Sequence, residues 1–134
     1  MQLDNALYAV AQIVHNFGAT AVVGLPVAAI CFKAKETTLR KIYWLTLCAW
    51  LAQAASGAGF GMVSYFVVGE LPEIHNLALA ALYVKISCAL FSIILLVAKL
   101  GQRLESVATG TLLRSLTGLG SAALFCAAIL RWFS

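Results

Sequence analysis

Apolar residues along this chain fall into four long runs that are separated by short polar segments. The runs cover roughly residues 6–32, 42–69, 74–98 and 109–132. Each exceeds the ~20 residues that an α-helix needs to cross a hydrocarbon core of about 30 Å. A soluble protein of 134 residues has no interior that could hide four such helices. The pattern therefore predicts an integral membrane protein.

The segments between the runs are short and read "KAKETTLRK", "ELPE" and "LGQRLESVA". Short links between long helices make sequential neighbours antiparallel. Pro72 and Glu73 suit a helix start, because proline fits the first turn and a carboxylate favours the positive helix end. We therefore expect an all-α membrane protein, a single domain over residues 1–134, whose four transmembrane helices form an up-down-up-down antiparallel bundle with approximate bounds 6–32, 42–69, 73–99 and 109–133.

Composition agrees, since 63% of the residues are hydrophobic and only 10% are charged. The net charge of +4 would suit a nucleic-acid partner, but the basic residues gather at one side of the predicted bundle. Seven of the nine Lys and Arg residues are on this side, whereas the opposite side has only Arg131 and Lys85 lies within a predicted span; the seven are Lys33, Lys35, Arg40, Lys41, Lys99, Arg103 and Arg114. By the positive-inside rule this side is cytoplasmic and both termini face outward. The charge then orients a multi-pass protein in a bacterial-type inner membrane and meets anionic lipid, with no nucleic acid involved.

Two ionisable residues lie inside the predicted spans at similar depth. His15 is 18 residues from Lys33 and Lys85 is 14 residues from Lys99. At ~1.5 Å per residue, they stand about 27 and 21 Å from the cytoplasmic boundary. A central Lys costs roughly 3 kcal/mol on insertion scales, so such residues usually face a bundle interior. The sequence predicts one polar pocket in the outer half of the bundle, which Gln53 and Ser56 can extend.

A neutral imidazole in such a pocket is a common axial ligand of haem iron. Gly18 and Ala19 follow His15 by three and four residues and leave the helix surface bare beside it. Lys85 can pair with a propionate. The second ligand is open, because His75 is the only other histidine and stands about 9 Å higher on the same scale. We expect a haem b site with His15 as the metal ligand, and the cofactor-binding candidates are His15, Asn16, Gly18, His75 and Lys85.

Each of these residues also has a structural interpretation. His15, with Asn16 beside it, can hydrogen-bond across helices. Lys85 can extend to the outer headgroups, some 10 Å away. His75 can be a solvated residue at the end of a loop. The shared depth of His15 and Lys85 is what favours a site.

Small residues recur every four positions on two of the predicted helices. Gly57 and Gly61 form a G-x-x-x-G pair, and Gly118 and Ala122 share the same step. This spacing lets helix backbones approach closely in lipid. The two faces predict packing inside the bundle or, alternatively, contact with a larger membrane complex or a second copy of the chain.

Two segments, "VHNFGATAVVG" and "LYVKISCALFSIILL", resemble the four-helix unit of the CopD-like and HemJ-like membrane proteins. The positions that match are His15, Gly24 and Lys85. The resemblance implies a tetrapyrrole or metal site around His15. The chain departs from the pattern where Val22 and Val23 replace an aromatic residue. It also holds only two methionines, which disfavours copper transfer.

The leading hypothesis is therefore a small haem b-type membrane protein with a redox or porphyrin-related role. A non-catalytic accessory or assembly subunit of a larger complex is the main alternative, and transport of copper or a small solute is a third. Chlorophyll could take the place of haem, since His can ligate its magnesium. The sequence shows no hydrolytic triad or phosphate-binding loop and does not decide whether the protein is an enzyme.

Overall fold

Four α-helices make up the chain in the computed structural model, which describes residues 2–68 and 76–133. They are α1 (Gln2–Cys31), α2 (Glu36–Val68), α3 (Asn76–Leu100) and α4 (Thr109–Phe133). The described residues contain no strand. The prediction of an all-α fold with four helices is therefore confirmed.

The main difference from the predicted bounds is the start of α2, which lies at Glu36 rather than residue 42. Residues 36–41 read "ETTLRK" and are mostly polar, so the apolar run could not reveal them. Glu36 in the first turn favours the helix there, because a carboxylate interacts well with the positive helix end. The predicted start of α3 at Pro72 and Glu73 lies outside the described residues.

Three of the helices are long and apolar enough to cross a membrane. The candidate spans are Ala6–Cys31 in α1, Leu77–Leu100 in α3 and Thr109–Trp132 in α4. Large apolar side chains on these helices face outward, and Phe17 and Phe125 are 75% and 69% exposed. Such an exterior suits a lipid environment far better than water. The membrane character predicted from the sequence is supported to this extent.

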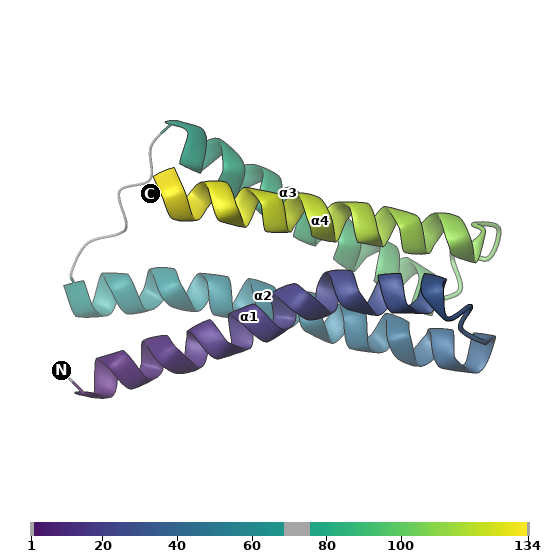
Figure 1. Ribbon diagram of the computed structural model, residues 1–134, viewed down its shortest axis with the longest axis horizontal. Coiled ribbons are helices and arrows are strands. Elements are labelled where there is room, and N and C mark those ends of the chain that lie inside the picture. Colours follow the sequence, from purple (N-terminus) through teal and green to yellow (C-terminus); the bar gives the residue numbers. More distant parts are fainter. Residues whose placement is uncertain (1, 69–75, 134) are drawn as a thin grey trace.

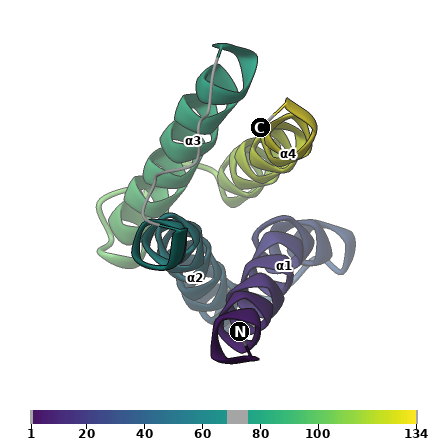
Figure 2. The ribbon, with the colours of Figure 1, turned by 90° about the vertical axis from the view of Figure 1, so that its left-hand side faces the viewer.

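The helices stand at four corners with their long axes roughly aligned. The pairs in contact are α1 with α2, α2 with α3, α3 with α4 and α1 with α4. Figure 2 shows α1 diagonally opposite α3. The connections at residues 32–35 and 101–108 lie together at one end, called the connection end below, and the start of α1 and the end of α4 lie at the other (Figure 1).

The apolar core is concentrated toward the connection end. Its largest fully buried side chains include Trp50 from α2, Leu96 from α3, and Leu112 and Leu116 from α4. Toward the opposite end the α1–α2 pair diverges from the α3–α4 pair (Figure 1).

A close approach between α1 and α4 depends on Gly120. A Cβ atom at this position would stand 2.9 Å from Val23 Cγ2 and 3.1 Å from the backbone oxygen of Val22. By contrast, a Cβ atom at Gly118 would meet no atom within 4 Å. The small residue that brings these helices together is thus Gly120, whereas Gly118 and Ala122 are exposed.

At the connection end, α1 and α3 end in the same way. Lys33 and Gln102 have positive φ angles of 48° and 59°. After α1, the Ala34 N–H donates to the Ala29 carbonyl at 3.0 Å and the Lys33 N–H to the Ile30 carbonyl at 3.2 Å. This is a Schellman motif, in which the left-handed residue is usually glycine.

Lys33→Gly should therefore stabilise the fold relative to Lys33→Ser by about 1 kcal/mol, because only glycine adopts this φ without a Cβ penalty. Both variants remove the same charge, so the comparison isolates the backbone effect. The free energy of unfolding, measured by denaturing-detergent titration in mixed micelles, tests this. Equal stability of the two variants would contradict it.

Candidate functional site

Polar side chains from α1, α2 and α3 meet inside the bundle. Lys85 Nζ lies 3.1 Å from His15 Nε2, across 70 positions of sequence. Ser56 Oγ lies 2.8 Å from His15 Nδ1. The similar depth predicted for His15 and Lys85 therefore corresponds to a direct contact. Because α1 and α3 are diagonal, this contact crosses the middle of the bundle (Figure 2).

Hydrogen bonding of Ser56 fixes which imidazole nitrogen carries the proton. Ser56 Oγ lies 2.6 Å from the Ala52 carbonyl and 3.2 Å from the Gln53 carbonyl, and its single proton is donated there. The hydroxyl oxygen then accepts a hydrogen bond from the N–H at His15 Nδ1. The remaining lone pair is on Nε2 and accepts from the Lys85 ammonium. His15 is thus a neutral imidazole whose Nε2 points toward α3.

Gln53 holds the backbone beside the imidazole. Its amide Nε2 donates a hydrogen bond to the His15 carbonyl. Gly18 makes room for this contact, since a Cβ atom there would stand 3.1 Å from Gln53 Nε2 and 3.3 Å from the Ala49 carbonyl. The face at Gly18 that the sequence suggested would be bare is therefore filled by α2. The Nε2 side of the His15 ring instead faces Lys85 on α3.

Phe60 completes the surroundings of the imidazole, and sequence reasoning did not anticipate it. Its ring meets the His15 ring edge-on, with centroids 5.5 Å apart and planes at 73°. Gln53, Ser56 and Phe60 follow each other at steps of three and four residues, which places them on one helix face. That spacing was the signal that could have identified Phe60.

The four polar members of the cluster differ in exposure. Gln53 and Ser56 are each 7% exposed, whereas His15 and Lys85 are half-buried. A polar group inside a low-dielectric bundle is stable only if its hydrogen-bonding needs are met. Each of these four side chains has at least one partner within the cluster.

The other predicted site residues are not in this cluster. Asn16 is exposed, and its Oδ1 accepts a hydrogen bond of 2.9 Å from Gln12 Nε2 on the same helix. His75, the predicted second histidine, lies outside the described residues. Among the residues that are described, no group of three or more His, Cys, Asp and Glu side chains could hold a metal ion. The arrangement offers one imidazole lone pair beside one ammonium group.

This geometry supports two kinds of chemistry. The Nε2 lone pair can ligate a metal if Lys85 moves away, because the hydrogen bond from Nδ1 to Ser56 already orients the ring, as such hydrogen bonds do for histidines in metal sites. Alternatively, a proton can pass between Lys85 and His15 along their hydrogen bond.

Comparison of the chain with family models, curated proteins and solved structures finds no match in any of the three, so the resemblance to CopD-like and HemJ-like proteins stays a prediction.

Proposed function

We propose that all four helices cross the membrane in an up-down-up-down bundle, with α2 as the fourth span. Support comes from the position of the connections at residues 32–35 and 101–108, which lie together (Figure 1). The basic residues Lys33, Lys35, Lys99 and Arg103 lie at or beside these connections. By the positive-inside rule this end faces the cytoplasm of a bacterial-type inner membrane, and both termini face outward.

We propose further that the protein binds a haem b-type tetrapyrrole through His15 Nε2. The observation that carries this proposal is the hydrogen bond of 2.8 Å between His15 Nδ1 and Ser56, because it leaves the lone pair on the nitrogen that points into the bundle. Lys85 would leave Nε2 on binding and pair with a carboxylate of the ligand. His15 would hold the iron, and the described residues contain no second histidine. A bound haem would supply reversible one-electron chemistry.

The absorption spectrum of the purified protein tests this proposal. Wild type in mild detergent, or after titration with hemin, should show a Soret band that His15→Ala removes. Ser56→Ala should weaken haem binding about tenfold or more, as loss of an outer-shell partner typically does. Asn16→Ala is the matched control and should bind like wild type, because Asn16 is exposed and bonded within α1. A colourless protein that stays so with hemin, or a band that survives His15→Ala, would contradict the proposal.

A second candidate function, that of an accessory subunit in a larger membrane complex or homo-oligomer, is favoured by the exposed small-residue face of α4. Gly118 and Ala122 lie on this face, and a Cβ atom at Gly118 would meet no atom within 4 Å. Such a face can take the backbone of another helix. An accessory subunit would purify colourless, co-migrate with a partner and tolerate His15→Ala.

A further inference from the structure

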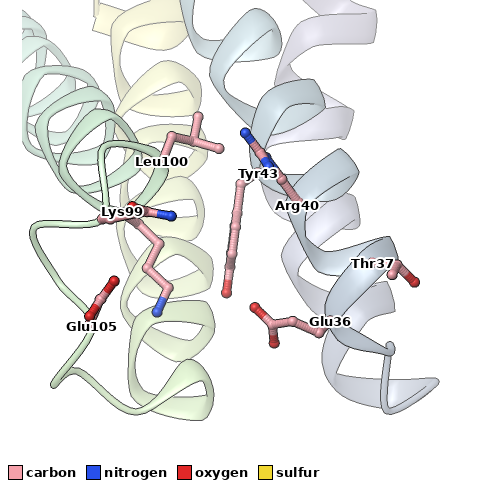
Figure 3. Close-up of a pocket in the computed structure, with 8 residues that line it drawn as sticks. Glu36, Thr37, Arg40, Tyr43, Lys99, Leu100 and Glu105 are labelled. Carbon is pink, nitrogen blue, oxygen red and sulfur yellow. The ribbon is translucent and has the colours of Figure 1, made fainter.

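A cavity of about 510 Å³ lies at the connection end, away from the His15 cluster. One wall of this open cavity is formed by the first turns of α2, and the other by the end of α3 and the connection that follows it. Its charged lining residues are Glu36 and Arg40 from α2, Lys99 from α3, and Glu105 from the connection (Figure 3). Two acidic and two basic side chains thus surround one space.

These four charged side chains do not pair with one another. Glu36 and Arg40 are four residues apart on α2, a spacing at which opposite charges commonly pair. Yet within the described part of the chain none of the four forms an ion pair, and Lys99 Nζ has only the Leu104 carbonyl at 3.4 Å. Figure 3 shows the Glu36 and Arg40 side chains pointing in different directions. The charges remain available to a ligand.

Tyr43 gives the second, independent sign of a ligand. It is only 3% exposed, it lines the cavity, and its hydroxyl group lacks a hydrogen-bond partner within the described residues. The nearest polar side chain is that of Thr109, which interacts only weakly with the Tyr43 hydroxyl and does not meet the geometry of a full hydrogen bond, and the Glu36 carboxylate acts on the hydroxyl as a nearby negative charge. In Figure 3 the Tyr43 ring lies between the two walls with its hydroxyl directed into the space. A buried hydroxyl without a partner is costly, which points to an acceptor supplied from outside.

We propose that this cavity binds a zwitterionic phosphate ester that carries a primary ammonium group, as in a phosphoethanolamine headgroup. Lys99 contacts the phosphate and Tyr43 donates to one of its oxygens, while Arg40, at the other end of the Tyr43 ring, adds positive charge to the wall (Figure 3). Glu36 and Glu105 accept hydrogen bonds from the ammonium group. A singly charged anionic headgroup fits less well, because nothing in it offsets the two carboxylates. The site is independent of the haem proposal.

The position of the cavity indicates where this ligand comes from. The connection end carries most of the basic residues, and Leu100 adds an apolar wall to the cavity. This end is where the headgroups of one leaflet lie if the helices span the membrane. A soluble phosphoethanolamine has the same charged groups, so the experiment separates the two sources.

Native mass spectrometry of the delipidated full chain, with phosphatidylethanolamine or phosphatidylglycerol added at equal concentration, tests the proposal. Wild type should bind phosphatidylethanolamine more tightly than phosphatidylglycerol. Tyr43→Phe should weaken phosphatidylethanolamine binding about tenfold, the value of one hydrogen bond to a charged group. Glu36→Gln combined with Glu105→Gln should abolish the preference between the two lipids. Arg114→Gln, which removes an exposed charge on α4 outside the cavity, is the matched control and should change neither affinity.

Competition with soluble phosphoethanolamine identifies the source. If it displaces the lipid, the headgroup chemistry alone suffices, and if it does not, the acyl chains are needed too. Both results support the proposal. Equal or tighter binding of phosphatidylglycerol, or wild-type affinity in a folded Tyr43→Phe variant, would overturn it. Circular dichroism and size-exclusion chromatography confirm that each variant is folded.

Discussion

Replacing His15 with leucine should lower the free energy of unfolding by about 3 kcal/mol. The substitution removes the hydrogen-bond acceptor of Lys85 Nζ, which lies 3.1 Å from His15 Nε2. It also removes the donor that Ser56 Oγ accepts from. A hydrogen bond to a charged group typically contributes about 1.5–3 kcal/mol, and leaving the Lys85 ammonium without its acceptor inside the bundle brings the cost to the upper end of that range. Denaturing-detergent titration of the purified variants in mixed micelles, followed by circular dichroism, measures the effect.

The double variant His15→Leu with Lys85→Leu should recover wild-type stability or exceed it. It removes the ammonium group together with its partner, and a central Lys costs roughly 3 kcal/mol on insertion scales. Asn16→Leu is the control for a new leucine on α1, because Asn16 is exposed and outside the cluster. A single His15→Leu variant as stable as wild type, or a double variant less stable than both singles, would contradict this interpretation.

The expected recovery bears on function as well as stability. If two leucines serve the bundle as well as His15 and Lys85 do, packing does not explain why the polar pair is present. Active sites commonly keep polar groups that lower stability, because their chemistry requires them. Comparing wild type, the two single variants and the double variant therefore distinguishes two roles for the His15–Lys85 pair. If the hydrogen bond is structural, the double variant stays unstable, and if the pair serves a functional site, stability is recovered.

Apolar runs predicted the number and order of the helices but not their full extent. A run of apolar residues marks where a helix meets lipid, and a helix can continue past that boundary. This is why α2 begins at Glu36, six residues before the predicted start at residue 42.

Counting residues along each helix predicted that His15 and Lys85 stand at similar depth, and they are in contact. The depth of a residue in the membrane depends only on its position along the helix and the rise per residue, so it can be predicted from the sequence. The direction in which each side chain points depends on how each helix is rotated about its axis, which no count supplies. The filling of the face at Gly18 by Gln53 and the contact with Phe60 could not be predicted for this reason.

The small-residue spacing illustrates the same limit on α4. The segment "TGLGSAA" holds two glycines two residues apart, so they lie on different faces of one helix. The four-residue step pointed to Gly118 and Ala122, whereas Gly120 makes the close contact with α1. Spacing identified a helix able to approach a neighbour but did not identify which face it uses.

Gly120→Leu should destabilise the bundle by about 3 kcal/mol, at the upper end of what overpacking a well-packed core costs. Even a Cβ atom would meet Val23 Cγ2 at 2.9 Å and the Val22 backbone oxygen at 3.1 Å, and leucine adds three more carbons beyond it. Val23 is β-branched and therefore stiff at χ1, and a backbone oxygen cannot rotate away. The helices α1 and α4 would have to separate. The same detergent titration measures this loss.

Gly118→Leu provides the matched control, because it makes the same substitution two residues away on α4, where a Cβ atom meets nothing within 4 Å. Leucine also raises helix propensity by up to about 1 kcal/mol at either site, so that contribution cancels in the comparison. Gly118→Leu should therefore be as stable as wild type or slightly more stable. Equal effects of the two substitutions would mean that α4 does not approach α1 through Gly120. A loss of stability at Gly118 alone would instead place that face against another helix, as the accessory-subunit alternative requires.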